Sequence, residues 1–328
     1  MSRKTFTVHP ILDDIKRVVI ESSNVRTNLE RLKEVAQKIA EQPCPQRDYS
    51  FYPDLDENDL VQFAFILHSI NFQFTEFQKP WRSFKVEYEG GEYNGFFGLV
   101  YSLRKALDQN TPILKANYLA YLTEEEARQF LTGKNIAIPM LTERVFILSE
   151  IGKVLAEKYD GRFSNLLKLS NKVFNCGKGL VEKIVTTFPS FNDIRIYKPT
   201  GNVVRFYKRA QLLLSDLHYN PKCSFELKDI DRLTVFSDYR LPQALRHIGI
   251  LEYSRELAMK VDSKIPLPEG SDEEVEIRAH TIYASNLLCK EINKYAEKPM
   301  TTSMLDFCLW LEAKKSEKPH HLTKTTHY

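Results

Sequence analysis

The stretch SDEEVEIRAHTIYASNLLCKEINKY, residues 271–295, has the signals of a long helix. Ser271 is a residue type that caps helix N-termini, because its hydroxyl accepts a hydrogen bond from an unpaired backbone N–H. The acidic residues 272–274 follow in the first turn, where negative charge is favourable. We therefore predict a helix from Ser271 to about Tyr295.

Apolar residues at helical spacing recur on both sides of this stretch. They predict helical segments over residues 11–40, 56–74, 142–159, 207–217 and 304–312. Pro43 and Pro45 end the first of these segments. Thr123 and Glu126 form a capping box that opens a further short helix. Most of the chain is thus predicted to be helical.

Two segments alternate apolar and polar residues instead. FKVEYEGGEYNGFF (84–97) has Gly90-Gly91 at its turn, and IRIYKPTGNVVRFY (194–207) turns at residues 199–201. Both patterns predict β-hairpins. Strands and helices do not alternate as in βαβ units, and a glycine-rich phosphate loop is absent from the sequence. The predicted fold class is mainly α with two small β-hairpins.

Composition is that of a globular protein. Of 328 residues, 43% are hydrophobic and 27% charged, which supports a sizeable core. We expect one domain over residues 1–315, in one body or in two helical lobes around one cleft, followed by a polar tail at 316–328. The net charge of +3 is too small to indicate a nucleic-acid coat or a membrane surface.

The cysteines favour a reducing compartment. Their number is odd and they form no Cys-x-x-Cys motif; they stand at positions 44, 176, 223, 289 and 308. The sequence also lacks a run of about 20 apolar residues, the length that a membrane span needs. We expect a soluble, cytoplasmic protein.

Common catalytic motifs are missing. The eight histidines form no metal-binding pair of the H-x-x-x-H type, and a Gly-x-Ser-x-Gly elbow does not occur. Cys176 has no histidine partner that the sequence identifies, so a structural role is favoured for it. These exclusions leave carboxylate chemistry or no chemistry.

The segment VRFYKRAQLLLSDLHY (204–219) places two cations where a strand passes into a helix. Lys208 and Arg209 would lie at the helix N-terminus, which already carries partial positive charge. A bound anion such as a phosphate would offset that repulsion. The alternative is a solvated basic pair.

A second unusual segment is DRLTVFSDYRLPQALRHIGILEY, residues 231–253. Asp238 lies between an apolar run and Pro242, in a predicted turn between helices. Such an aspartate is commonly a helix cap. It could instead be a carboxylate beside the aromatic face of Phe236, stabilising the oxocarbenium-like cation of glycosidic cleavage or attacking the anomeric carbon.

Several motifs, in this order and spacing, resemble the queuosine salvage family. They are NFQF (71–74), YNGFFGLVYSLRKALDQNTPI (93–113), LTERVFILSEIGKVL (141–155), YKRAQ (207–211), FSDYRLPQAL (236–245), EVEIRA (274–279) and LDFCLW (305–310). The resemblance extends from about residue 10 to residue 312. Thr75 and Leu311 depart from the family pattern, which has a tryptophan and often an acid there.

This resemblance implies a helical fold related to helix-hairpin-helix DNA glycosylases. It also implies an N-glycosylase that hydrolyses queuosine 5'-phosphate to queuine, for insertion into transfer RNA, without metal or organic cofactor. By the family's motifs, Asp238 would be the catalytic carboxylate and Lys208 a second active-site residue. Phe236 would line the base pocket, and Asp306 and Phe307 would contact the base.

The residue types suit these roles. The Asp306 carboxylate can accept hydrogen bonds from the adjacent N–H groups of a guanine-like base, and Phe236 and Phe307 can stack on its ring. Glu276 and Arg278 in EVEIRA stand two apart on a helix and so point in different directions, which indicates that at least one is structural. Two alternatives stay open: a non-catalytic queuine- or nucleotide-binding protein, and a glycosylase acting on nucleic-acid bases.

Overall fold

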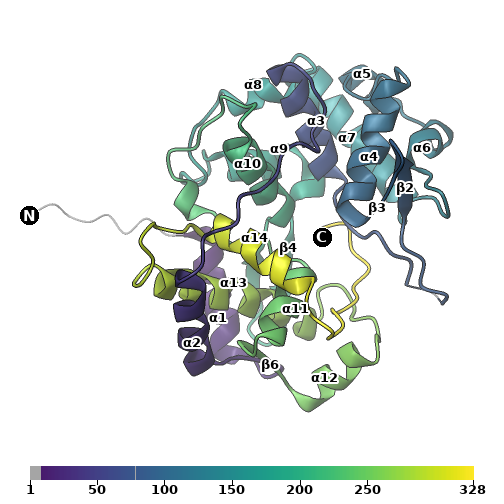
Figure 1. Ribbon diagram of the computed structural model, residues 1–328. Coiled ribbons are helices and arrows are strands. Elements are labelled where there is room, and N and C mark those ends of the chain that lie inside the picture. Colours follow the sequence, from purple (N-terminus) through teal and green to yellow (C-terminus); the bar gives the residue numbers. More distant parts are fainter. Residues whose placement is uncertain (1–8, 78) are drawn as a thin grey trace, which may run out of the picture. The chain divides into compact units, whose positions relative to one another are not determined.

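Helices make up most of the protein. The computed structural model describes residues 9–77 and 79–328, and 14 α-helices and three two-stranded antiparallel sheets lie in that part of the chain (Figure 1). The prediction of a mainly helical fold is confirmed. The chain divides into a first unit (Met1–Pro45, Asp193–Lys208 and Ile230–Thr323) and a second unit (Gln46–Asn192, Arg209–Asp229 and Lys324–Tyr328).

The first unit contains the Ser271 helix and the elements around it. Its helices are α1 (Pro10–Glu21), α2 (Leu29–Ala40), α11 (Arg240–His247), α12 (Arg255–Asp262), α13 (Asp272–Ile292) and α14 (Thr302–Ala313), with a 3-10 turn at Ile230–Arg232. Its strands are β1 (Val25–Thr27), β4 (Ile194–Tyr197), β5 (Asn202–Arg205) and β6 (Leu251–Tyr253).

Helix α13 is the central helix of this unit. Its Ser271 cap is confirmed, since the hydroxyl accepts a hydrogen bond from the Glu274 backbone N–H. Helices α1, α2, α11 and α14 pack against it (Figure 1). Most of its length is therefore buried on all sides, which explains why ionisable side chains such as Glu276 and Arg278 occur on it without facing solvent.

The prediction of a continuous helical segment over residues 11–40 is wrong in the middle. The chain leaves helix α1 after Glu21 and forms β1, which pairs antiparallel with β6. The Glu276 carboxylate accepts hydrogen bonds from the backbone N–H groups of Asn24 (2.6 Å) and Val25 (3.2 Å). These contacts come from residues far away in the sequence, so helical periodicity alone could not reveal the break.

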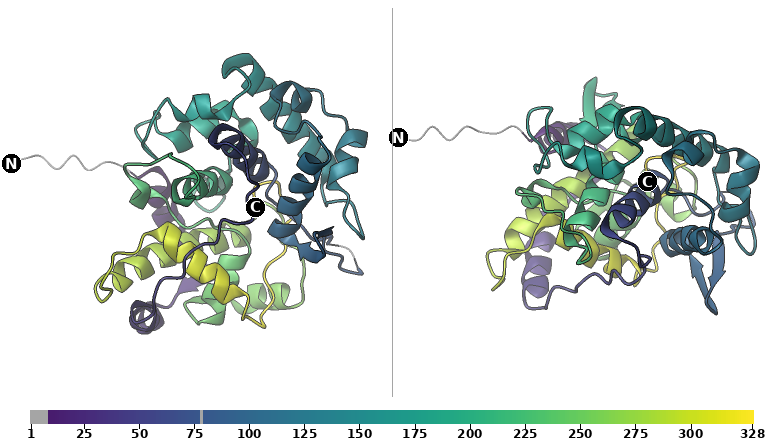
Figure 2. Two further views of the ribbon diagram at one scale, coloured as in Figure 1. Left: turned by 45° about the horizontal axis from the view of Figure 1, so that its top comes forward. Right: turned by 90° about the horizontal axis from the view of Figure 1, so that it is seen from above.

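The second unit holds the remaining elements. Its helices are α3 (Glu57–Ser69), α4 (Gly95–Asp108), α5 (Ala116–Ala120), α6 (Glu124–Leu131), α7 (Leu141–Lys158), α8 (Phe163–Leu167), α9 (Leu180–Thr187) and nearly all of α10 (Lys208–Tyr219). A 3-10 turn covers Pro189–Phe191, and the strands are β2 (Lys85–Tyr88) and β3 (Gly91–Asn94). Figure 2 shows the β2–β3 hairpin beside α4, on which it packs.

Helix α3 is buried, as its apolar pattern predicted, but it ends at Ser69 and does not continue to Phe74. The buried Arg144 of helix α7 donates hydrogen bonds to the backbone carbonyls of Ile70, Phe72 and Gln73. Its guanidinium also lies 4.0 Å from the centre of the Phe72 ring. These carbonyls are thus bonded outside any helical ladder.

Both predicted hairpins are present. Strands β2 and β3 pair Lys85 with Asn94, and strands β4 and β5 pair Ile194 with Arg205. The third sheet, β1–β6, was not predicted, because its strands are short and distant in the sequence. The capping box of Thr123 with Glu126 is confirmed at the start of α6.

The segment expected as a polar tail, 316–328, contains no helix or strand, yet several of its side chains are buried. Its part in the first unit is bonded to the rest of that unit: the Lys318 carbonyl accepts a hydrogen bond from Gln243, and the Leu322 carbonyl accepts one from the Leu267 N–H. Among the described residues, helices with the length and apolar character of a membrane span do not occur.

Candidate active site

Asp238 lies immediately before helix α11. One carboxylate oxygen, Oδ1, accepts hydrogen bonds from the backbone N–H groups of Arg240 (2.7 Å) and Leu241 (3.2 Å). Asp238 is half-buried and makes no other hydrogen bond within the described part of the chain. The start of helix α11 thus fixes the orientation of the carboxylate through one of its two oxygens. The two interpretations of this residue, cap and reactive carboxylate, are compatible.

Phe236 and Asp306 are in direct contact. The backbone N–H of Phe236 donates to Asp306 Oδ1 at 2.7 Å, although the two residues are 70 positions apart. Asp306 is 6% exposed on helix α14, and the Phe236 side chain is 2% exposed. Asp306 therefore fixes the segment that leads to Asp238.

Phe307 follows Asp306 on helix α14 and is half-buried. Its ring lies nearly parallel to that of Trp310, with centroids 6.0 Å apart and an interplanar angle of 16°. The ammonium of Lys314 lies 3.8 Å from the centre of the Trp310 ring. Burial, together with the charge of Arg240, lowers the pKa of Lys314. Helix α14 thus carries an aromatic pair that begins one residue after Asp306.

Lys208 is the first residue of helix α10, two residues after Phe206. The predicted change from strand to helix is confirmed, since β5 ends at Arg205. Lys208 is 5% exposed and Arg209 is 1% exposed. The alternative of a solvated basic pair is therefore wrong. Arg209 belongs to the second unit, where its guanidinium donates to the carbonyls of Ser69 and Ser190.

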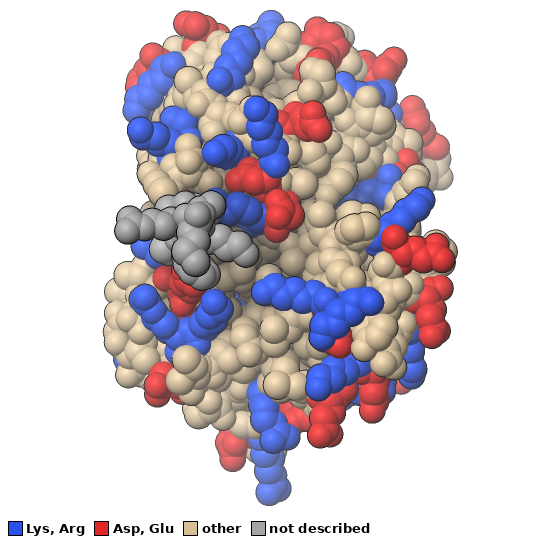
Figure 3. Space-filling model, turned by 90° about the vertical axis from the view of Figure 1, so that its left-hand side faces the viewer, with Lys and Arg blue, Asp and Glu red and all other residues tan. Residues whose placement is uncertain are grey.

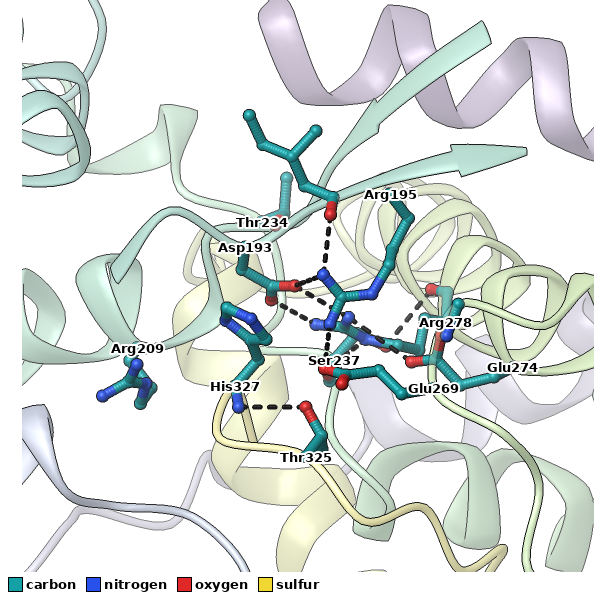
Figure 4. Close-up of polar contacts among 12 residues, drawn as sticks. Asp193, Arg195, Arg209, Thr234, Ser237, Glu269, Glu274, Arg278, Thr325 and His327 are labelled. Carbon is teal, nitrogen blue, oxygen red and sulfur yellow. Dashed lines mark hydrogen bonds and ion pairs between the residues drawn. The ribbon is translucent and has the colours of Figure 1, made fainter. Parts of the chain in front are cut away.

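The buried Arg278 joins the surroundings of Lys208 to those of Asp238. The Phe206 ring lies against its guanidinium, and the guanidinium Nε donates to the carbonyl of Ser237, the residue before Asp238. The Ser237 hydroxyl in turn donates to the backbone carbonyl of Arg278. Asp193 forms an ion pair with the same guanidinium (Figure 4). Asp193 carried no signal in the sequence, because nothing there relates it to an arginine 85 positions away.

His320 also lies near Asp238, and the sequence did not place it there. Its ring packs on that of Tyr239 with centroids 4.5 Å apart, and its Nδ1–H donates to the His321 carbonyl. Burial lowers the pKa of His320, while the charge of Asp238 acts in the opposite direction. Burial and the Asp238 charge raise the pKa of Tyr239 to about 12.

A separate cavity of about 560 Å³ in the first unit is lined by none of the predicted site residues. Strands β1 and β6 and residues His280 and Tyr283 of helix α13 line it. His280 is held between Ser22 Oγ (2.7 Å) and Thr27 Oγ1 (2.9 Å), and burial lowers its pKa to about 4. A neutral histidine with both nitrogens bonded is a structural feature of this cavity.

In the part of the chain that the structure describes, no group of three or more His, Cys, Asp or Glu side chains could hold a metal ion.

The predicted site residues comprise two carboxylates, a buried lysine and two aromatic rings. Asp238, Phe236, Asp306 and Phe307 are brought together by the contact of the 236–238 segment with helix α14. Lys208 is connected to them through the surroundings of Arg278.

Comparison with known proteins identifies the family. Residues 51–328 match the family described as queuosine salvage protein. The chain is similar to proteins named queuosine 5'-phosphate N-glycosylase/hydrolase: 33% identical to that of Sphaerobacter thermophilus, with 97% of each chain covered, and 34% identical to that of Bos taurus, with 82% of this chain and 81% of the relative covered. The relative from Schizosaccharomyces pombe is 27% identical, with 93% of this chain and 91% of its own covered. The chain belongs to the queuosine salvage protein family.

Proposed function

We propose that this protein is a queuosine 5'-phosphate N-glycosylase/hydrolase that releases queuine. The support is its membership of the family and its similarity over most of its length to proteins with that name. In the proposed reaction the bond between C1' of the ribose and the base nitrogen breaks. The oxygen of water bonds to C1', and the base leaves with a proton, giving queuine and ribose 5-phosphate.

The geometry of Asp238 is the single observation that supports this chemistry best. Its Oδ1 is held by two backbone N–H groups, which orient the carboxylate without a neutralising cation. An oriented carboxylate stabilises the positive charge that develops at C1' when the glycosidic bond breaks. We assign that role to Asp238. Its carboxylate would either stabilise the cation electrostatically or attack C1' through one of its oxygens.

The other site residues are assigned by the same chemistry. Lys208, buried at the start of α10, would pair with a phosphate or ribose oxygen. Asp306 would accept hydrogen bonds from the N–H groups of the base, as a carboxylate can. Phe307 and Phe236 would form the aromatic wall for the base. Residues 1–315 would make up the catalytic domain, with a fold related to helix-hairpin-helix DNA glycosylases as the resemblance implies.

The substrate is proposed to be a mononucleotide, bound without a metal or organic cofactor. A nucleic-acid glycosylase draws much of its affinity from phosphate contacts along a basic surface. On the face shown in Figure 3, basic and acidic side chains are interspersed, and the net charge of the chain is +3. Both observations favour a small nucleotide over duplex DNA or RNA.

The direct test is incubation of the purified protein with queuosine 5'-phosphate and a chelator, with chromatographic detection of queuine. Release of queuine is the expected result. Saturable binding of the nucleotide without release of queuine would show that the protein is a binding protein and not an enzyme. Turnover that requires a polynucleotide and falls steeply with salt concentration would show that the substrate is a nucleic acid and not a mononucleotide.

A further inference from the structure

Arg278 of helix α13 is fully buried and lies within ion-pair distance of two carboxylates. Its Nη1 and Nη2 donate to the two carboxylate oxygens of Asp193 at 3.0 and 2.5 Å, a two-pronged ion pair (Figure 4). Glu274, one turn earlier on the same helix and equally buried, lies 3.5 Å from Nη1. Removing these charges from water is costly, and hydrophobic residues of similar volume often stabilise a core at least as well. Stability alone therefore gives a weak reason for an arginine here.

The same guanidinium contacts the segment that carries Lys208. Its Cζ lies 3.9 Å from the centre of the Phe206 ring, and the backbone N–H of Phe206 donates to the Asp193 carbonyl at 3.0 Å. Between Phe206 and Lys208 stands Tyr207, whose φ of 51° is the left-handed conformation that bulky residues rarely adopt. A strained residue persists only where its surroundings hold it, and it sets the direction of the helix that follows.

Arg278 also contacts the segment that carries Asp238. Its Nε donates to the Ser237 carbonyl at 3.3 Å, and the Ser237 hydroxyl donates to the Arg278 carbonyl at 3.2 Å. Ser237 immediately precedes Asp238. The Arg278 side chain thus contacts Ser237, the residue before Asp238, and Phe206, two residues before Lys208, on segments far apart in the sequence.

We propose that Arg278, together with Asp193, is a positioning residue that holds Lys208 and Asp238 in register for cleavage of the glycosidic bond. This inference rests on the proposed function. A lysine cannot replace the arginine, because it offers no planar fork for Asp193, no flat face for Phe206 and no Nε–H for Ser237. Misplacement of catalytic groups by about 1 Å can lower a rate about 100-fold.

The decisive variant is Arg278→Lys, and Glu276→Gln is its matched control. Glu276 is equally buried on the same helix, but it bonds to the backbone of Asn24 and Val25 and to the Tyr197 hydroxyl. Arg278→Lys should lower kcat by about 10- to 100-fold, with a smaller rise in KM, because Lys208 is displaced while the base contacts on helix α14 remain. Glu276→Gln should lower the melting temperature with a much smaller effect on kcat.

A second readout does not depend on turnover. Hydrogen exchange followed by mass spectrometry should show faster exchange in residues 204–208 and 233–241 of Arg278→Lys, and in residues 22–28 of Glu276→Gln. Unchanged exchange in the first two segments would overturn the proposal, as would a kcat loss no greater than that of the control. If the wild type releases no queuine, the proposed function fails, and the exchange pattern still decides whether Arg278 holds both segments.

If Arg278→Lys does not fold, Asp193→Asn provides the same test. The asparagine keeps one oxygen acceptor for the guanidinium and loses the second prong and the charge. A kcat loss with a folded protein and faster exchange in the same two segments supports the proposal. Normal kcat in a folded Asp193→Asn protein contradicts it.

Discussion

Both units contain fully buried arginines, and Arg278 of the first unit is held differently from Arg144 of the second. Arg278 in the first unit is paired with carboxylates, those of Asp193 and Glu274. Arg144 in the second unit donates instead to backbone carbonyls, among them those of Ile70 and Phe72. Burial and the charge of a neighbouring arginine, Arg209, lower the pKa of Arg144 well below its usual value.

This difference separates two uses of a buried cation. Arg144 satisfies backbone carbonyls in the segment just after helix α3, so we expect its loss to be felt as lost stability. Arg278 fixes segments next to Asp238 and Lys208, so we expect its loss to be felt in turnover. The following predictions test this comparison, from the largest effect to the smallest.

Replacing Arg144 by methionine should have the largest effect on stability, and it should act on the second unit. The variant leaves several buried carbonyls without a donor, each costing about 1–3 kcal/mol, so the free energy of unfolding should fall by at least about 3 kcal/mol. Urea unfolding measures it. Arg128→Met, at an exposed arginine of helix α6, is the control and should change stability little. Equal stability of the two variants would contradict the role given to Arg144.

Lys208→Ala should lower kcat/KM by about 100-fold, through a higher KM and a lower kcat, because a buried cation facing a phosphate or ribose oxygen is lost. Steady-state kinetics with queuosine 5'-phosphate measures both parameters. Lys222→Ala removes an exposed lysine paired with Asp54 and should leave them unchanged. Wild-type kinetics for Lys208→Ala would reduce Lys208 to a structural residue.

Acid should destabilise the first unit through His280. Burial lowers its pKa to about 4, so the unfolded chain binds the proton more tightly than the folded one. The stability that neutral His280 contributes is fully present above about pH 6.5 and is lost as the pH falls towards 4. The free energy of unfolding should fall by about 2 kcal/mol between pH 7 and pH 5.

The check is the unfolding free energy at pH 7 and pH 5 for the wild type and for His280→Gln, whose side chain does not titrate. The difference between the two pH values should be smaller in the variant. An unchanged difference would show that the acid sensitivity arises elsewhere.

The smallest effect is expected at the exposed pair Arg26–Glu252, which bridges β1 and β6. Exposed ion pairs contribute at most about 1 kcal/mol, so Arg26→Gln should shift the free energy of unfolding by no more than that and leave turnover unchanged. A loss of stability comparable to that of Arg144→Met would mean that an exposed arginine can contribute as much to the stability of this protein as a buried one.

Local patterns in the sequence predicted a large part of the fold. Helical spacing, the Ser271 cap and the two hairpin turns each depend on neighbouring residues; the cap and both hairpins are confirmed, and helical spacing was right except for the break between α1 and α2 and the end of α3. The break between α1 and α2 was missed because it depends on Glu276 and on pairing with β6. Contacts between residues far apart in the chain leave no periodic signal.

The candidate site follows the same division. Its motifs marked Asp238, Lys208 and Asp306, and the structure brings Asp306 into contact with the segment before Asp238. Asp193 and the packing of Phe206 on Arg278 could not be predicted, since both are tertiary contacts without a local motif. The catalytic assignments remain predictions that kinetics has to test.

The measurement that tests the account most directly is the turnover of Asp238→Asn with queuosine 5'-phosphate. Asparagine keeps an oxygen for the N–H groups of Arg240 and Leu241, so the start of helix α11 should be preserved while the charge is lost. We predict that the folded variant binds the nucleotide with nearly unchanged affinity and that kcat for queuine release falls by at least about 100- to 1,000-fold. Near-normal turnover would contradict the assignment of Asp238 as the carboxylate that stabilises or attacks C1'.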